Sequence, residues 1–307
     1  MNGWAANTAS SRVQVYRMKY FLIVLLFALA TLVFAQEPPT SSENAPSQPI
    51  PTDPENTKKA RAVLDQAIEA LGGQAYLNVQ DVKQEGRSYG FHRGETKGPG
   101  VTFTRVRKLW DKDRVDYTVS QEIDYPFIYI DIPVGSSKTH VSLIYNGDKG
   151  YEVTNKGVRD MNDKDDIGAY LRRRHFSLDA VLRQWLNQPG VALFYEGQTV
   201  AAQKPVDQVT VMNAKNEAVT LYLDSNSHLP VKKSFTWRDP TDKQRNVEEE
   251  VFDNYRPIQG VMTAFDDTRF FNGEMSAQAF LTKTSYNQGV ADTLFSPHEV
   301  ANASKKR

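Results

Sequence analysis

The 307-residue sequence contains no cysteine. This absence excludes disulfide bonds, and it also excludes a lipid-modified cysteine after an export signal. The fold must therefore be stabilised by its hydrophobic core. A chain of this length is long enough for such a core, as one large domain or as two small ones.

The sequence also has no net charge, with 37 basic and 37 acidic residues. Nothing in this balance indicates a nucleic acid or another polyanion as partner. The five histidines are scattered without metal-ligand spacing, and HExxH, Walker, G-x-G-x-x-G and G-x-S-x-G motifs are absent. We therefore expect no metal, no cofactor and no catalytic residue, as in a non-enzymatic protein.

The N-terminus has the pattern of an export signal. Arg12, Arg17 and Lys19 precede an apolar run over residues 20–34, which is shorter than the roughly 20 residues of a membrane span. Small residues up to Ala35 predict cleavage after Ala35 and export to the periplasm. Met18 offers an alternative start, in which case residues 1–17 are an upstream extension. Residues 36–52 are rich in Pro, Ser and Glu and are expected to form a disordered linker.

One amphipathic helix should follow the linker. Asp53 is a typical N-cap, and Pro54 suits the first helical position. Apolar residues then recur at helical spacing and form one stripe, which indicates a helix lying on a sheet: Ala60, Val63, Leu64, Ala67, Ile68 and Leu71.

The next part of the chain reads as strands interrupted by one helical segment. Residues 162–187 are predicted to be helical, with Ser177 as an internal cap. The apolar run 127–130 fits a strand buried on both faces or an exposed hydrophobic lip. Strands are predicted at residues 82–91, 101–110, 114–120, 125–132, 139–145, 150–154, 191–196, 199–200 and 208–212.

Residues 217–286 predict a meander of antiparallel strands. Short turns separate the strands, and Asn272-Gly273 is a strong hairpin signal. Alternation predicts a buried face with Val219, Phe235, Trp237 and Val251, and a solvated face that includes Glu248 and Glu250. The expected fold class is mainly β (α+β), with one large curved antiparallel sheet. Its strands are 218–223, 229–237, 246–255, 261–271 and 275–286.

Charged clusters leave two alternatives open. Acidic groups at Asp163/Asp165/Asp166, Glu248–Glu250 and Asp266/Asp267 would allow a carboxylate hydrolase, in which Glu250 and Asp266 are the residues to test. They equally suit a helix N-terminus and a solvated strand face. The run Arg172–His175 is interpreted as a solvated helix face, or as an electrostatic patch for a lipid headgroup or an acidic partner.

Several motifs resemble one known family. Leu71-Gly72-Gly73 ends the first helix, VTLYLDSNSHLPVKK spans residues 219–233, DNYRPIQGV spans 253–261, and TSYNQGVADTLF spans 284–295. Over residues 56–297 this pattern resembles the LolA/LolB-like superfamily of outer-membrane lipoprotein-sorting proteins. The chain is longer than a minimal carrier of that family. It also lacks the cysteine that the lipoprotein form of the receptor needs.

The resemblance implies a half-open β-barrel, covered by helices on its concave side, with a hydrophobic cavity for acyl chains. We expect one such domain over residues 53–297 and a flexible tail over 298–307. The predicted lining residues are Leu221, Leu223, Phe235, Trp237, Val251, Phe265, Leu178, Leu182 and Trp185.

The implied function is that of a periplasmic carrier for lipoprotein acyl chains or lipids, with peripheral membrane contact allowed. The alternatives are a regulatory or structural envelope protein that senses lipid or a protein partner, and the exported hydrolase.

Overall fold

The chain divides into two compact units, Met1–Ser47 and Gln48–Arg307. The computed structural model describes residues 53–119, 139–161 and 164–305, which all belong to the second unit. The predicted export signal, the linker and the strand at 125–132 lie outside these residues. Within the described residues, no helix is both long and apolar enough to cross a membrane.

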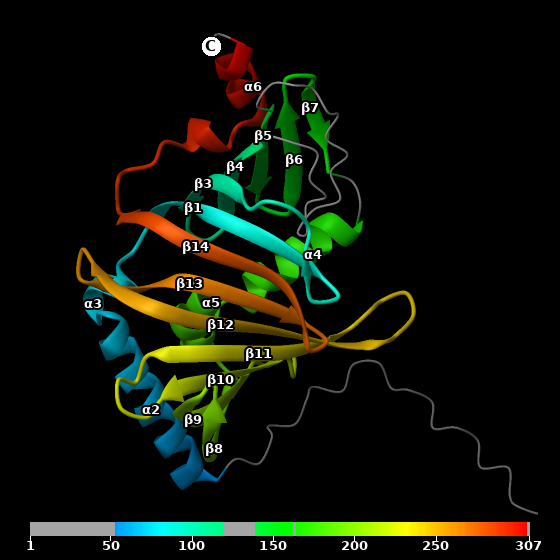
Figure 1. The fold of residues 1–307 in the computed structure, drawn as a ribbon. Coiled ribbons are helices and arrows are strands. Elements are labelled where there is room, and N and C mark those ends of the chain that lie inside the picture. The colour runs from blue at the N-terminus through cyan, green and yellow to red at the C-terminus, as the bar shows by residue number, and fades with distance from the viewer. Residues whose placement is uncertain (1–52, 120–138, 162–163, 306–307) are drawn as a thin grey trace, which may run out of the picture. The chain divides into compact units, whose positions relative to one another are not determined.

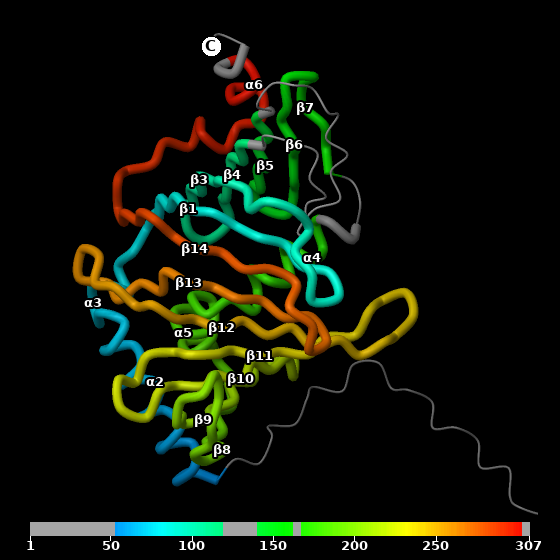
Figure 2. Tube along the Cα trace, in the orientation of Figure 1, coloured from blue at the N-terminus to red at the C-terminus, as the bar shows by residue number. Residues whose placement is uncertain are grey.

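A single 14-stranded antiparallel sheet dominates the second unit, and it runs in the order β7-β6-β5-β4-β3-β1-β14-β13-β12-β11-β10-β9-β8, with β2 paired to β1 (Figures 1 and 2). The sheet is curved and does not close, since β7 and β8 remain its two ends. The strands are β1 (Asp81–His92), β2 (Glu95–Thr96), β3 (Val101–Lys108), β4 (Lys112–Val119), β5 (Thr139–Asn146), β6 (Lys149–Thr154), β7 (Gly157–Asp160), β8 (Ala192–Ala201), β9 (Lys204–Met212), β10 (Ala218–Asp224), β11 (Pro230–Arg238), β12 (Arg245–Ile258), β13 (Val261–Phe271) and β14 (Glu274–Tyr286).

The predicted meander is confirmed as β10 to β14, each strand paired with the next. The pairing that joins the two halves of the chain is β1 with β14, from Val82 opposite Tyr286 to Gly90 opposite Ala277. This pairing links the first and the last strand in sequence. It converts two meanders into one sheet, and thus the fold class predicted from the sequence is confirmed.

Helix α2 (Pro54–Leu71) covers the β8–β9 end of the sheet (Figure 1). The Asp53 side chain accepts a hydrogen bond from the Glu55 backbone N–H at 3.0 Å, so the predicted cap is present. The short helix α3 (Gln74–Leu77) follows it. The apolar stripe of α2 is buried in the main core, whose largest members include Leu64, Leu182, Trp185, Leu221, Leu223 and Phe235.

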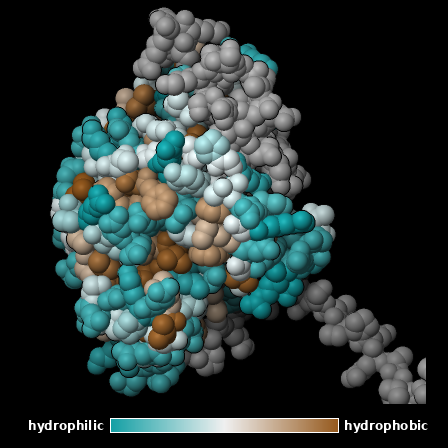
Figure 3. Space-filling model, in the orientation of Figure 1, coloured by the Kyte–Doolittle hydropathy of each residue, from teal (hydrophilic) through white to brown (hydrophobic). Residues whose placement is uncertain are grey.

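Helices α4 (Lys164–His175) and α5 (Leu178–Arg183) and the 3-10 turn η1 (Trp185–Asn187) make up the predicted helical segment. Ser177 caps α5 by accepting from the Ala180 N–H at 3.2 Å. In Figure 1 both helices lie behind the sheet. Figure 3 shows the other face, where apolar side chains are interspersed among hydrophilic ones. We call the face that α4 and α5 cover the inner face.

The C-terminal segment corrects one prediction. A flexible tail was expected from residue 298, but the chain forms the 3-10 turn η2 (Asp292–Phe295) and helix α6 (Pro297–Lys305). Phe295, Val300 and Ala301 are buried in a small core with Ile144 and Val153. Proline suits the first position of this helix, but so short a helix is stable only when its two apolar residues pack against other elements. The strands that supply this packing are distant in sequence.

Two smaller predictions also differ. The strands predicted at residues 191–196 and 199–200 are parts of the single strand β8, which begins at Ala192, because a bulge between Tyr195 and Gly197 continues the ladder across the expected gap. Strands β2 and β7 were not predicted from the sequence, since each has at most four residues and little alternation.

Candidate functional site

The inner face contains a cavity of about 1750 Å³. Its walls come from α4 and α5 on one side and from β1, β3, β4 and β11–β14 on the other. This exceeds the roughly 300–1,000 Å³ of pockets for drug-sized ligands. The cavity therefore has room for a large or long-chained ligand.

Three of the nine predicted lining residues border this cavity: Leu178, Phe235 and Trp237. Four others, Leu182, Trp185, Leu221 and Leu223, are at most 2% exposed and belong to the packed core. The sequence did not separate these two groups, because alternation marks a buried face without showing where its packing leaves a space. The assignment of ligand contacts to any of the nine stays a prediction.

The last two predicted residues, Val251 and Phe265, do not border the cavity. Val251 pairs with Lys232 across β11–β12, and Lys233 rather than Lys232 faces inward. Phe265 is buried under the exposed Arg256, whose guanidinium carbon lies 4.4 Å from its ring centroid.

The predicted faces of β12 are thus wrong in part. Phe235 lies opposite Glu248 and Lys233 lies opposite Glu250, so both glutamates share the inner face with Phe235. A strand in which valines alternate with glutamates does not reveal which set is covered. Asn254 has a φ of 53°, and this left-handed residue interrupts the alternation, so that Tyr255 returns to the core.

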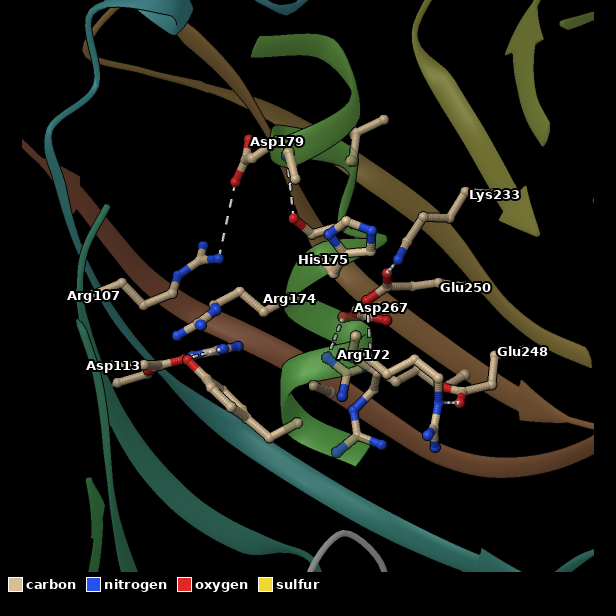
Figure 4. Close-up of a pocket in the computed structure, with 18 of the residues that line it drawn as sticks. Arg107, Asp113, Arg172, Arg174, His175, Asp179, Lys233, Glu248, Glu250 and Asp267 are labelled. Atoms are coloured by element: carbon tan, nitrogen blue, oxygen red, sulfur yellow. Dashed lines mark hydrogen bonds and ion pairs between the residues drawn. The ribbon is translucent and has the colours of Figure 1, made fainter. Parts of the chain in front are cut away.

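A network of buried and partly buried charges crosses the inner face at this point (Figure 4). The Lys233 Nζ lies 2.7 Å from Glu250 Oε2, and it donates to the carbonyl of Phe176 at 3.1 Å. The Arg269 Nε lies 3.2 Å from Glu250 Oε1, and its Nη2 lies 3.3 Å from Asp267 Oδ2. Two carboxyl groups and two cations therefore form one connected cluster.

The two carboxyl groups of this cluster differ in pKa. Burial raises the pKa of Glu250, but the charges of Lys233 and Arg269 outweigh burial and hold this pKa well below its ordinary value. Burial and the negative charge of Glu250 raise the pKa of Asp267 to about 7. Glu250 thus carries the negative charge, and Asp267 keeps its proton up to neutral pH.

The arginine run of α4 is the second charged element of the site. Arg172, Arg173 and Arg174 are half-buried and border the cavity, so the interpretation as a solvated face is wrong for them. The Arg172 Nε lies 2.9 Å from Glu248 Oε1, and its guanidinium carbon stacks 3.4 Å from the Trp237 ring centroid. Figure 4 shows Arg172, Arg174 and His175 on the helix that faces Lys233, Glu250 and Asp267.

Arg174 and His175, at the end of the run, contact other parts of the protein. The Arg174 Nη1 donates to the carbonyl of Gly147 at 2.8 Å, and the His175 Nε2 lies 2.8 Å from Glu217 Oε2. These contacts join α4 to the β5–β6 turn and to the start of β10. They hold the covering helix to two distant parts of the sheet.

The far wall of the cavity has a further ion pair that the sequence did not indicate. Asp113 on β4 is nearly fully buried and forms a bidentate pair with Arg105 on β3. The Tyr170 hydroxyl of α4 donates to Asp113 Oδ2 at 3.3 Å, and the Tyr170 ring stacks on Tyr145 at 3.6 Å between centroids. No local motif marks these residues, because β3, β4 and α4 meet only in the folded chain.

The carboxyl groups give little support to hydrolysis. Asp266 pairs with Asp253 on the outer side, so it does not face the same space as Glu250. The neighbour of Glu250 on the inner face is Asp267, and both are held by cations. Among the residues that the structure describes, no group of three or more His, Cys, Asp or Glu side chains could hold a metal ion.

No protein-family model and no curated protein matches the chain. Three solved structures are similar to it. A DUF1329 family protein from Desulfovibrio piger is 13% identical, covers 77% of this chain and 96% of its own, and has a TM-score of 0.49. A putative outer membrane lipoprotein-sorting protein domain from Vibrio parahaemolyticus is 12% identical, with coverage of 81% and 100% and a TM-score of 0.46. A LolA superfamily protein from Nitrosomonas europaea is 11% identical, with coverage of 77% and 96% and a TM-score of 0.43.

These likenesses concern the fold alone. The curved, unclosed sheet and the helices that cover its inner face agree with the half-open, helix-covered sheet that was predicted from the sequence. The inner face departs from the purely hydrophobic cavity that the resemblance implied, because arginines and carboxylates line it together with aromatic residues.

Proposed function

We propose that this protein is a non-enzymatic carrier or binding protein for molecules with acyl chains, lipids or lipoprotein acyl chains, in the bacterial periplasm. The observation that carries the proposal is the cavity of about 1750 Å³ between the sheet and helices α4 and α5. Each methylene group that leaves water for such a cavity contributes about 0.8 kcal/mol. A long chain therefore binds without many polar contacts.

Apolar side chains supply two surfaces for the chain. One lies at the main core, with Leu178, Phe235 and Trp237. The other lies on β3–β5, with Phe103, Val115, Tyr117, Leu143 and Tyr145. The charged network described above borders the same space, so an amphiphile suits this cavity better than a plain hydrocarbon.

The periplasmic location rests on the export signal predicted over residues 1–35. The acyl-chain ligand is what the resemblance to lipoprotein-sorting proteins implies. Both parts of the proposal can be tested on the exported protein.

The test is native mass spectrometry of the exported protein, purified from a periplasm without detergent, followed by organic extraction of bound molecules. We expect a co-purifying acyl lipid. Leu178→Glu and Trp237→Glu should lose it, because each places a charge among the apolar lining residues. Leu221 is unsuitable for this purpose, since a charge at a fully buried core position would unfold the protein.

Val200→Glu is the matched control, because Val200 is 72% exposed on the edge strand β8 and does not border the cavity. This variant should retain the lipid. A folded protein that is free of lipid and does not take up a fluorescent fatty acid would overturn the carrier function.

A further inference from the structure

Arg173 differs from the two arginines beside it in helix α4. Its neighbours Arg172 and Arg174 are bound to Glu248 and to the Gly147 carbonyl. Among the residues that the structure describes, no hydrogen bond or ion pair reaches the Arg173 guanidinium. The side chain is nevertheless half-buried and borders the cavity.

The surroundings of Arg173 are positive. Burial and the nearby charge of Arg269 lower the pKa of Arg173, and Glu248 offsets only part of this effect. Tyr117 lies in the same neighbourhood. The positive charges of Arg105, Arg173 and Arg269 each act to lower the pKa of its hydroxyl group, against the larger effect of burial. Three guanidinium groups from β3, α4 and β13 therefore gather around one part of the cavity.

The carboxylates described at this site do not neutralise all three guanidinium groups. Asp113 is bound to Arg105, and Glu250 is shared by Arg269 and Lys233. Asp267 keeps its proton up to neutral pH, as argued above. Among the residues that the structure describes, Arg173 thus has no carboxylate of its own, and its positive charge faces the cavity.

An unpaired, partly desolvated cation destabilises a folded protein unless a ligand compensates it. A guanidinium offers up to five N–H donors in a planar fork, which fits the oxygens of a phosphate or a carboxylate.

We propose that Arg173, together with Arg269, binds the anionic group of the ligand, a phosphate or a carboxylate. This proposal rests on the proposed function where the anion is the headgroup of an amphiphile, and it stands alone where the anion is free. The cavity then has a defined polarity. The anion lies at the arginines between α4 and β13, and the chain extends along the aromatic lining.

The test is isothermal titration calorimetry of the full mature protein with four probes. Dodecyl phosphate and dodecanoate carry an anion on a chain, dodecyl maltoside carries the same chain without charge, and sodium phosphate is the anion alone. We expect the two anionic amphiphiles to bind at least about tenfold more tightly than the maltoside, since charge-assisted hydrogen bonds are roughly twice as strong as neutral ones.

Arg173→Gln should remove this preference and leave the affinity for the maltoside unchanged. Arg173→Lys keeps the charge and should retain most of the preference. Arg87→Gln removes a guanidinium that donates to the carbonyl of Gly100 outside the cavity, so it is the matched control and should bind like the wild type. The melting temperature of Arg173→Gln should equal or exceed that of the wild type, because no partner is left unpaired.

Equal affinities of the wild type for all three dodecyl compounds would overturn the anion site and leave the carrier function intact. An equal weakening of all three by Arg173→Gln would also overturn it. Binding of phosphate alone, without any dodecyl compound, would support the anion site and contradict the carrier function. If phosphate binds as tightly as dodecyl phosphate, the ligand is a free anion and not a headgroup.

Discussion

The ammonium nitrogen of Lys233 lies 2.7 Å from a carboxylate oxygen of Glu250, across the β11–β12 pair, and the Lys233 side chain is only 4% exposed. The same nitrogen donates to the carbonyl of Phe176, between α4 and α5. One buried cation therefore connects the covering helices to two strands. We therefore expect the walls of the cavity to depend on this connection.

Lys233→Met should lower the free energy of unfolding by about 3–5 kcal/mol, because it leaves the largely buried Glu250 carboxylate, which is 17% exposed, with less compensation. Urea denaturation at neutral pH measures the change. Lys232→Met is the matched control on the outer face, where its partner Glu249 is 2.5 Å away and both side chains are 23% exposed. We expect a loss of at most about 1 kcal/mol there. Equal losses in the two variants would show that the inner pair has no special role.

Asp267 should make stability depend on pH. Its folded-state pKa of about 7 lies above the ordinary 3.8, so between these values the folded protein binds more protons than the unfolded one. The contribution of Asp267 to stability therefore falls as pH rises from about 4 to about 7. Glu250 does not cancel this trend above pH 5, because its pKa is lowered and it stays ionised.

Asp267→Asn should remove this dependence and be more stable than the wild type at pH 8, by roughly 2 kcal/mol. Urea denaturation between pH 5 and pH 8 tests it. Asp266→Asn, on the outer side, is the control. A wild-type stability that rises steadily from pH 5 to pH 8 would contradict the raised pKa.

Gly72 ends helix α2 with a φ of 123°, and a Cβ atom there would lie 2.2 Å from the Gly260 carbonyl oxygen. Gly157 has a similar φ of 130°, but a Cβ atom there meets nothing within 4 Å. Both alanine variants carry the cost of a positive φ, about 1 kcal/mol. Gly72→Ala should cost about 1–3 kcal/mol more, because the β12–β13 turn must move. Comparing the melting temperatures of the two alanine variants isolates the effect of the clash with the Gly260 carbonyl. Equal melting temperatures would show that this clash has no cost.

Asp81 holds the segment that follows β14. Its carboxylate accepts from the backbone N–H groups of Gln288, Gly289 and Val290 at 2.8, 2.9 and 3.1 Å. Asp81→Ala leaves these donors without their partner and should cost about 1–3 kcal/mol, whereas Asp81→Asn keeps one acceptor oxygen and should cost less. Amide hydrogen exchange at residues 288–290 is the direct measurement. Unchanged protection in Asp81→Ala would show that these bonds do not hold the segment.

Local sequence patterns were sufficient for the elements whose determinants are local. Helix α2 has its cap and apolar stripe within one segment, and the Asn272-Gly273 turn lies inside the hairpin that it forms. The β10–β14 meander was predictable for the same reason, since each strand pairs with the next one in the chain.

The face of β12 and the helix α6 were not predictable in this way. Glu248 and Glu250 face inward because Arg172, Lys233 and Arg269, from three other elements, compensate them. Helix α6 is held by a core that includes Ile144 and Val153, which lie far away in the sequence. A period of two residues shows that a strand has two faces, but it does not show which one is covered.

The sequence by itself determined the class of fold, one large antiparallel sheet with a capped helix at its start, because hydrophobic periodicity and turn residues act over a few positions. The tertiary structure alone decided the character of the cavity. Leu221 and Leu223 became core, Phe235 and Trp237 became lining, and Arg173 faces the cavity without a partner among the described residues. Burial and charge compensation are set by residues from distant segments, and only the folded chain brings those segments together.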